Sequence, residues 1–423
     1  MGQPGGARRQ ALAALFVVAA AGLSLARQSG AGALDTVYAE DGSVFLASAF
    51  SQSTLDSLST PYAGYLHLVP RLLSELVSLL PVSSAAAGVA VLAALTTGLL
   101  ALLVFVASRD HLPSLPARLL VSTVVVLVPV GQEELPNSIA NLHWPALYAL
   151  FWVLLWRPTS RAGRIVAIAA VALISLSDLL SLVFAPLALW LWWRRRDRHS
   201  LTLGIALAVG LVTQFSVVLF GQSERVLTPE PVMWAPWYAI RAVPVGVLGQ
   251  RLFPADVNTL WLAFAAVAWL LVAAVLVFAW RRGLTGWRLA ALAGAYSVAV
   301  YALPVALSGQ ATPRYAAAPA MLLVTAFAAL LIGREPWKLS AAGIVLIVFC
   351  AAVWAVNLRV PNDRSTGPTW SDEVRQAEQT CTSKVPPSLP QHTDAEMEAR
   401  VDISLAPAGW KMSVPCREVL AWD

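Results

Sequence analysis

The chain has 423 residues, of which 58% are hydrophobic and only 13% are charged. Because an average soluble domain carries about 25% charged residues, this composition excludes an ordinary soluble fold and indicates a polytopic helical membrane protein. The net charge of +5 does not indicate nucleic acid as a partner. The basic residues stand in short clusters between apolar runs, and no basic tract is interleaved with aromatic residues.

Eleven apolar segments predict about eleven transmembrane helices. The first follows two arginines and also has the length of a signal peptide's apolar core, but we expect it to stay as an uncleaved first helix. The segments are residues 11–26, 83–107, 118–131, 144–156, 165–176, 179–193, 201–220, 260–280, 289–307, 316–332 and 339–356. We therefore predict an all-α membrane domain over residues 1–357 and a small extracytoplasmic α/β tail over residues 358–423.

The charged residues predict the orientation of these segments. Placing the N-terminus in the cytoplasm collects most basic residues on that side, whereas of the 24 acidic residues only Asp110, Asp197 and Glu335 join them. This positive-inside asymmetry over short loops predicts a multi-pass protein with a cytoplasmic N-terminus and an extracytoplasmic C-terminus. Because arginine supplies nearly all the cations, a bias of GC-rich bacteria, we expect a bacterial plasma membrane. The cytoplasmic basic residues would be Arg8, Arg9, Arg109, Arg118, Arg157, Arg161, Arg164, Arg194, Arg195, Arg196, Arg198, Arg281, Arg282, Arg288, Arg334 and Lys338.

Residues 165–193 allow two topologies. A single tilted helix containing Asp178 would place the arginines before and after it on opposite faces of the membrane and would turn every later loop over. A break at Ser177–Asp178 keeps the basic clusters on one side, so we predict two segments. An acid inside the membrane is rare and usually functional, although Asp178 is also a suitable N-cap for the helix that follows.

Several of the predicted segments are too short to cross a membrane. Residues 118–131 give about 21 Å of helix against a hydrocarbon core of about 30 Å, and residues 144–156 are no longer. The loops that join such helices would lie at membrane depth, where irregular backbone needs a wet or protein-lined cavity. The sequence therefore predicts a polar crater open to the outside, lined by Glu133, Glu134, Asn137, Asn141, His143 and Asp178.

Two predicted outer loops, residues 27–82 and 221–259, carry amphipathic segments. The first loop contains Arg71 and Glu75, four residues apart within "YLHLVPRLLSELVSLLP". The second contains "VMWAPWYAIRAVPVGVLGQRLF", in which tryptophans and a tyrosine accompany Arg241. Both patterns predict helices that lie in the outer membrane interface.

The tail has the pattern of a small covalently closed domain. The alternation in "ARVDISLAPAGWKMSVPC" predicts a β-hairpin. Cys381 and Cys416 flank this segment and are expected to form a disulfide, which suits an oxidising compartment outside the cytoplasm. Cys350 lies in the last apolar segment and is expected to pack as a free thiol.

The first outer loop begins with two adjacent acids, Glu40 and Asp41, in "YAEDGSVF". Such a pair is either a solvated pair of acids in an ordinary loop, or it contains a carboxylate that acts as a general base at a recessed site. Together with the amphipathic outer segments, the short spans and the outer tail, this stretch resembles the GT-C fold glycosyltransferases. These membrane enzymes take a sugar from a polyprenyl-phosphate carrier on the outer face. The stretches "EELPNSIANLHW" and "TPRYAAAP" also resemble outer-loop patterns of bacterial members of this class.

The resemblance implies an inverting hexosyl- or pentosyltransferase. In such a reaction a carboxylate deprotonates the acceptor hydroxyl as that hydroxyl attacks the sugar. We expect Asp41 to be this base, because Gly42 leaves it room and because Glu40 would point elsewhere along an extended chain.

Other residues are expected to hold the two substrates. The lipid phosphate leaves as an anion and needs a cation. For this role we rank Arg314 first, followed by Arg241 and Arg71, although each arginine is also a suitable anchor to lipid headgroups. The expected substrate-binding residues are Tyr38, Tyr62, Tyr65, His67, Glu133, Glu134, Asn137, Asn141, His143, Trp144, Asp178 and Tyr315.

No motif predicts a cofactor. The five histidines are scattered without ligand spacing, and only a divalent cation held by Glu40, Asp41 and His143 is left open. The absence of nucleotide-binding motifs argues against nucleotide sugars and ATP-driven transport. The expected partners are a polyprenyl-phosphate-linked sugar, a glycan or lipid acceptor of the cell envelope, and membrane lipids.

Two other function classes stay open. A transporter or lipid flippase would use the crater as half of an alternating-access path, and it predicts internal repeats and polar residues on both faces at midplane depth. A non-catalytic assembly scaffold would need no recessed acids. The sequence shows no convincing repeat, and its membrane polarity is one-sided, so the glycosyltransferase interpretation is favoured.

Overall fold

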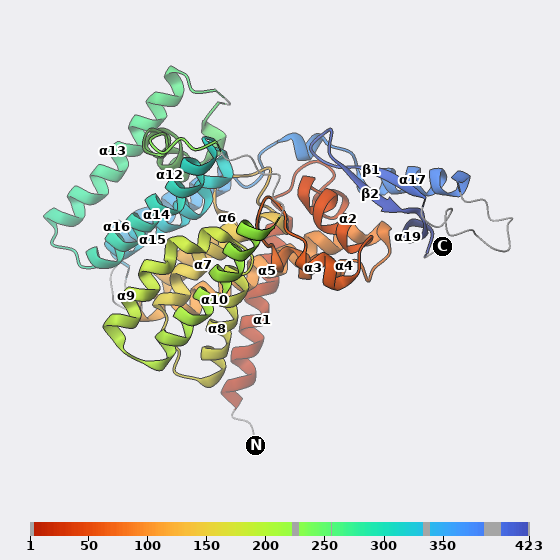
Figure 1. Cartoon of the computed structure of the whole chain (residues 1–423). Coiled ribbons are helices and arrows are strands. Elements are labelled where there is room, and N and C mark those ends of the chain that lie inside the picture. The colour runs from red at the N-terminus through yellow and green to blue at the C-terminus, as the bar shows by residue number, and fades with distance from the viewer. Residues whose placement is uncertain (1–3, 222–227, 255, 333–338, 385–398, 422–423) are drawn as a thin grey trace.

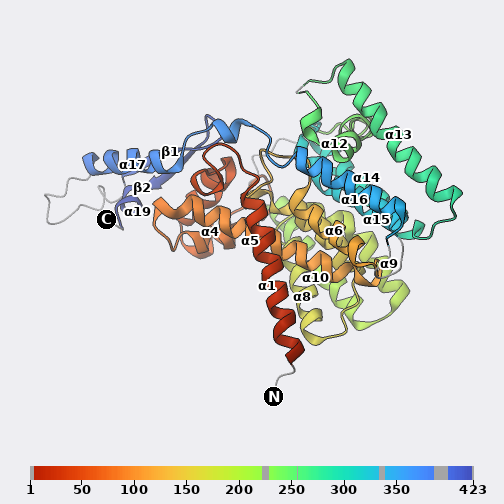
Figure 2. The ribbon, with the colours of Figure 1, turned by 180° about the vertical axis from the view of Figure 1, so that it is seen from behind.

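The computed structural model describes residues 4–221, 228–254, 256–332, 339–384 and 399–421. The chain is mostly helical, with one small sheet near its C-terminus (Figures 1 and 2). The helices that cover the predicted segments are α1 (Pro4–Leu25), α5 (Ala85–Ala107), α6 (Leu115–Leu127), α7 (His143–Leu155), α8 (Arg161–Ser175), α9 (Ala185–Arg195), α10 (Arg198–Phe220), α13 (Thr259–Arg281), α14 (Trp287–Ser308), α15 (Ala317–Leu331) and α16 (Ala341–Val356).

A helix is present at every one of the eleven predicted segments, which confirms the mostly helical class, but the predicted count of eleven transmembrane helices is not confirmed. Within the described part of the chain, six helical stretches are long and apolar enough to cross a membrane. They are Gly6–Leu25, Val82–Asp110, Arg198–Phe220, Thr259–Arg281, Trp287–Ser308 and Pro313–Leu331. The predicted shortness of the others is confirmed, since α6 and α7 have 13 residues each.

The predicted break at Ser177–Asp178 is confirmed, and a single helix over residues 165–193 is wrong. Helix α8 ends at Ser175, and Asp178 has extended backbone angles of φ −151° and ψ 120°. Its carboxylate accepts a hydrogen bond from the backbone N–H of Leu180 at 2.8 Å, which caps the short helix η6 (Leu179–Phe184) before α9. A charged residue that can cap a helix therefore ends one apolar run and starts the next.

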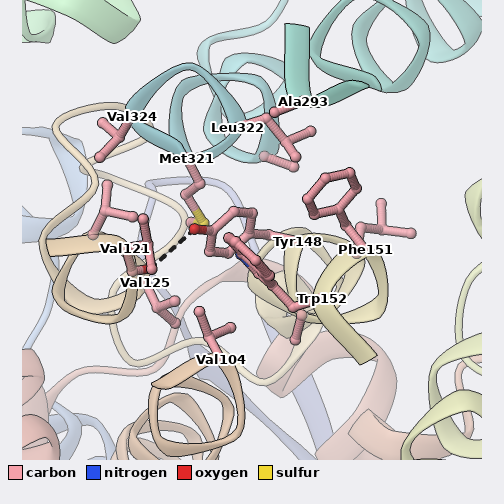
Figure 3. Packing of buried hydrophobic residues seen from close by; sticks show 14 of the residues in the cluster. Val104, Val121, Val125, Tyr148, Phe151, Trp152, Ala293, Met321, Leu322 and Val324 are labelled. Carbon is pink, nitrogen blue, oxygen red and sulfur yellow. Dashed lines mark hydrogen bonds between the residues drawn. The ribbon is translucent and has the colours of Figure 1, made fainter. Parts of the chain in front are cut away.

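Two helices, α7 and α15, form the centre of the bundle because they are apolar on all sides. Tyr148 of α7 and Met321 of α15 are fully buried, and Figure 3 shows them among the valines of α5 and α6. The Tyr148 hydroxyl is hydrogen-bonded to the Val121 carbonyl at 3.0 Å and to the Thr325 hydroxyl at 2.8 Å. In contrast, α13 lies at the edge of the bundle (Figure 1), and few of its residues are buried.

The second outer loop only partly follows its prediction. It forms α11 (Trp234–Trp237), the π-helix η7 (Tyr238–Ala242), α12 (Val243–Leu248) and the 3-10 helix η8 (Gln250–Leu252). The expectation of an interfacial helix is wrong for α12, which is buried along its whole length. Gly246 has no side chain, and a Cβ there would lie only 3.0 Å from that of Ala320, so α12 packs directly on α15.

The tail packs against residues 27–82, the predicted first outer loop. That loop contains the π-helix η2 (Asp41–Leu46), α2 (Ala47–Ala49), α3 (Thr54–Ser59) and α4 (Leu68–Val77). The tail contains α17 (Trp370–Lys384), the strands β1 (Arg400–Ser404) and β2 (Lys411–Pro415), and α19 (Cys416–Leu420). The strands pair antiparallel with Ile403 opposite Met412, which confirms the predicted hairpin. Both side chains share one core with Phe45 and Leu46 of the loop, so the tail packs directly over the acidic motif.

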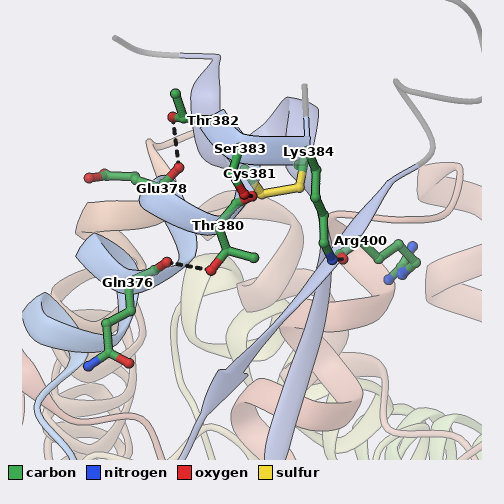
Figure 4. The surroundings of a disulfide bond; sticks show 9 residues. Gln376, Glu378, Thr380, Cys381, Thr382, Ser383, Lys384 and Arg400 are labelled. Carbon is green, nitrogen blue, oxygen red and sulfur yellow. Dashed lines mark hydrogen bonds between the residues drawn. A yellow bond between two sulfur atoms is a disulfide. The ribbon is translucent and has the colours of Figure 1, made fainter. Parts of the chain in front are cut away.

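The cysteine predictions are confirmed. Cys381 of α17 is bonded to Cys416 of α19, and the two are 35 residues apart in sequence (Figure 4). Both are fully buried, whereas Cys350 is a buried free thiol in α16. The disulfide closes the tail around the hairpin and holds it as a unit beneath α17.

Candidate functional site

The acidic motif is held in place by the tail. The backbone N–H of Ala39 donates to the Ala406 carbonyl at 2.7 Å, and the N–H of Ala406 donates to the Val37 carbonyl at 3.2 Å. The chain then turns at Ala39, whose φ is +21°, and enters the π-helix η2. Single π-helical turns are frequent at functional sites, and here the turn sends Glu40 and Asp41 in different directions.

Asp41 points into the protein and holds the next loop. Its side chain is fully buried, and its Oδ1 accepts hydrogen bonds from the Ser138 hydroxyl at 3.0 Å and the Ala140 N–H at 2.8 Å. Burial raises the pKa of Asp41 to about 7, although these hydrogen bonds and the nearby Arg364 oppose the rise. Its Oδ2 has no hydrogen-bond partner among the described residues.

Glu40 lies in a different environment. Glu40 has helical backbone angles, with φ −63° and ψ −27°. The expectation that it lies on an extended chain, which favoured Asp41 as the base, is therefore wrong. Its side chain is partly exposed, and its charge raises the pKa values of Glu134 and Tyr38. Glu40 therefore faces the loop that contains Glu134, while Asp41 is buried behind it.

The loop between α6 and α7 contributes the second part of the site. Glu134 forms an ion pair with Arg314, with 2.5 Å between Oε2 and the guanidinium Nη1. Burial raises the pKa of Glu134, and Arg314 opposes that rise. Its neighbour Glu133 also has a raised pKa, because of burial and the negative charge of Asp363. An acid-rich loop thus contacts an arginine from the segment before α15.

The third part is a histidine–aspartate pair at the start of α7. The His143 Nδ1 lies 3.4 Å from Oδ2 of the buried Asp178. The His143 ring contacts the edge of Trp144 at 4.6 Å, and Trp144 in turn lies 5.4 Å from the ring of Tyr315. Because Tyr315 directly follows Arg314 in the chain, this aromatic contact connects the His143–Asp178 pair to the Glu134–Arg314 ion pair.

The remaining predicted residues divide into structural groups and a separate cluster. Asn137, with a φ of +58°, bonds Ser24 at 3.0 Å through both ends of its amide. The amide of Asn141 donates to the Ser138 hydroxyl. The two amides therefore form hydrogen bonds that stabilise the irregular loop, and they do not face the Glu134–Arg314 and His143–Asp178 pairs.

The aromatic residues of the first outer loop form a cluster of their own. Tyr65 stacks on His67 at 4.1 Å, and Tyr62 and His67 both pack against Phe45. Arg71 lies over the same Phe45 ring at 5.5 Å, is only 1% exposed and has no hydrogen bond from its guanidinium to a described residue. Burial lowers the pKa of Arg71 to about 10. The three arginines predicted to bind the lipid phosphate, Arg314, Arg241 and Arg71, thus lie in three different parts of the structure.

Arg364 is a residue of the site that was not predicted from the sequence. Its guanidinium is 1% exposed, donates to the Pro136 carbonyl at 2.6 Å and lies over the Tyr38 ring at 5.7 Å. The charge of Asp41 acts on it and raises its pKa, against the larger lowering by burial. Its only local signal is the capping turn that Asn362 and Ser365 form around it, and such a turn does not identify a partner more than two hundred residues away.

The surroundings of Asp41 predict a dependence of stability on pH. A carboxyl whose folded pKa is about 7 keeps its proton in the folded state while the unfolded state loses it, so stability falls as the pH rises from about 4 to 7. The loss is at most about 4 kcal/mol. Asp41→Asn removes this dependence on pH. The melting temperature of the variant, relative to that of the wild type, should therefore be higher at pH 8 than at pH 5. An equal difference in melting temperature at both pH values would contradict the shift.

The site provides no ready metal centre. Among the described residues, no three His, Cys, Asp or Glu side chains lie close enough to hold an ion. In particular, Glu40, Asp41 and His143 do not form such a group, because Asp41 is turned towards Ser138 and His143 towards Asp178. The residues brought together are Glu40, Glu134, Arg314, His143, Asp178, Trp144 and Tyr315. No protein-family model, curated protein or solved structure matches the chain.

Proposed function

We propose that the protein is a glycosyltransferase that moves a sugar from a polyprenyl-phosphate carrier to a cell-envelope hydroxyl, glycan or lipid, at the outer face of a bacterial plasma membrane. The observation that carries the proposal is the meeting of Glu40, the Glu134–Arg314 ion pair and the His143–Asp178 pair at a loop between two short helices. Carboxylates, a histidine and a guanidinium gathered at one loop suit proton removal beside a departing anion.

The chemistry assigned to these residues is an inverting displacement. The acceptor oxygen forms a bond to the anomeric carbon, the bond from that carbon to the phosphate oxygen breaks, and the acceptor proton passes to a carboxylate. The Glu40–Asp41 pair supplies that carboxylate. Glu40 is the member open to the polar cluster, and Asp41, with its raised pKa and unpartnered Oδ2, is the rival within the pair.

Other residues of the cluster would bind the two substrates. The leaving phosphate would compete with Glu134 for Arg314, whose guanidinium also lies over the Tyr315 ring at 5.8 Å. Trp144 and Tyr315 are buried, so their rings would pack beneath the substrates and support the residues that contact them. His143 can donate or accept a hydrogen bond at a sugar hydroxyl, with Asp178 orienting its ring.

The site requires a defined orientation in the membrane. We expect the N-terminus in the cytoplasm and the polar cluster and tail outside. Single cysteines placed at Gly221 and at Gly283 in a Cys350→Ser background should react with an impermeant thiol reagent from opposite sides, the first from outside and the second from inside. The reverse pattern would contradict both the orientation and the outward-facing site.

A transfer assay tests the function directly. The purified full chain in nanodiscs is supplied with labelled prenyl-phosphate hexoses and pentoses and with an envelope extract as acceptor. Transfer of label to the acceptor supports the proposal. If no donor gives transfer but proteoliposomes with the protein move lipids or solutes across the bilayer, the transporter or flippase alternative replaces it.

A further inference from the structure

A cavity of about 120 Å³ lies on the other side of the segment that contains Arg314. It is bounded by α12, η8, the start of α13, the end of α14 and residues 311–316. Because a water molecule occupies roughly 30 Å³ in the liquid, the cavity has room for a group of several heavy atoms. Its polar lining consists of Arg241, Gln250, Tyr301 and Thr312, and the rest is apolar or aromatic.

Three polar groups in the wall of this cavity have no hydrogen-bond partner in the described part of the chain. They are the Tyr301 hydroxyl, the Thr312 hydroxyl and the Arg241 Nε. Tyr301 is fully buried in α14, so its hydroxyl has no access to bulk water. Leaving buried donors unpaired is unfavourable, and three of them around one cavity point to a ligand that accepts hydrogen bonds.

The guanidinium of Arg241 is held ready for an anion. It lies between two indole rings, 4.7 Å from Trp237 and 5.2 Å from Trp261, which fixes its plane. Its one hydrogen bond within the described part of the chain, to the Ala311 carbonyl, is long at 3.5 Å, and it forms no ion pair with a described residue. Arg314, in contrast, is already paired with Glu134.

The arrangement of donors favours a phosphate group over a carboxylate. A guanidinium and two hydroxyls approach the cavity from three elements, η7, α14 and the segment before α15. A phosphate ester presents two or three free oxygens in different directions, whereas a carboxylate presents two in one plane. Phosphate therefore uses more of the available donors.

The surroundings indicate that the phosphate arrives on an apolar molecule. Phe253, Trp261 and Ala316 line the cavity beside Arg241. Next to it, α13 exposes large apolar side chains such as Leu262 and Leu270. On the other face of α12, a smaller apolar void of about 20 Å³ lies between α12, α15 and α16. The cavity thus adjoins apolar surface on α13.

We propose that this cavity binds the phosphate group of a membrane lipid through Arg241, Tyr301 and Thr312. The group is either that of a prenyl phosphate or that of an anionic phospholipid, which share this chemistry. The proposal does not depend on glycosyl transfer, since it follows from the cavity and its unpartnered donors.

Binding to the purified full chain in detergent tests the proposal with three probes: farnesyl phosphate, phosphatidylglycerol and inorganic phosphate. Removing one hydrogen bond to a charged ligand weakens binding about tenfold. Tyr301→Phe should therefore weaken lipid binding about tenfold, and Arg241→Met at least as much. In the absence of lipid, Tyr301→Phe should also raise the melting temperature, because it removes an unpaired buried hydroxyl.

Two matched variants serve as controls. Tyr148→Phe removes a buried hydroxyl that has two partners, so it should lower the melting temperature and leave lipid binding unchanged. Arg251→Met removes a nearby exposed arginine that bonds the Val356 carbonyl and should also leave binding unchanged.

The outcomes separate the sources of the phosphate and the two proposals. Whichever of farnesyl phosphate and phosphatidylglycerol binds more tightly identifies the class of lipid, and either result supports the site. Binding of inorganic phosphate as tight as that of both lipids overturns it, as does lipid binding that survives both Tyr301→Phe and Arg241→Met. Glu40→Gln should leave lipid binding at this cavity unchanged. Lipid binding and sugar transfer are measured separately, so either proposal can fail without the other.

Discussion

Glu40→Gln is expected to slow sugar transfer by about 10²–10⁴-fold, the usual contribution of a general base. The change keeps the shape of the side chain and removes its basicity. Because Glu40 is partly exposed and has no hydrogen bond that another residue depends on, the variant should unfold at the wild-type temperature. Initial rates with a saturating prenyl-phosphate sugar, together with donor binding, separate a slower chemical step from a weaker complex.

Asp41→Asn is the matched variant for this prediction. The amide oxygen can still accept the hydrogen bonds from Ser138 and Ala140, so the loop should stay in place. If the large loss of transfer appears in Asp41→Asn and not in Glu40→Gln, Asp41 is the base, as the sequence first suggested. Normal transfer in both variants would remove the acidic pair from the mechanism.

Arg364→Met is expected to destabilise the protein by about 1–3 kcal/mol, the cost of leaving a buried acceptor without its charged donor. The variant leaves the Pro136 carbonyl and the Asp41 carboxylate without their cation. The pKa of Asp41 should then rise above its present value of about 7, because Arg364 is one of the groups that hold it down. Transfer should fall with stability, since the acidic motif loses its support.

Arg375→Met is the control for this change. Arg375 lies in the same tail, is 64% exposed and pairs with the exposed Asp372 at 2.9 Å. An exposed pair of this kind contributes little to stability because solvent screens it. Thermal unfolding of the two variants side by side decides the question, and equal melting temperatures would show that Arg364 does not hold the motif.

The helices were predictable because each follows from a local property of the chain. Residues 339–356, for example, are almost entirely apolar, and the structure has α16 over Ala341–Val356. The break before η6 was predictable because Asp178 is both charged and a suitable N-cap. The tail hairpin was predictable from alternation, since Val401 and Ile403 face the core.

The partners of buried polar residues were not predictable in this way. Asp41 is held by Ser138, 97 residues away, and Arg364 by Pro136, 228 residues away. Nothing local in either sequence stretch specifies such a pair. The amphipathic pattern of α4 indicated an apolar face but not that η2 would cover Arg71 with Phe45. Likewise, the tryptophans near Arg241 indicated an interface, while the cavity depends on Tyr301 and Thr312 from other helices.

The measurement that bears most directly on glycosyl transfer is a count of both products in proteoliposomes. With labelled prenyl-phosphate sugar in the outer leaflet and acceptor outside, the wild-type protein should release one prenyl phosphate for each sugar transferred, and Glu40→Gln should release almost none. Prenyl phosphate released without glycosylated acceptor, or labelled lipid that appears in the inner leaflet with its sugar still attached, would contradict the transferase function.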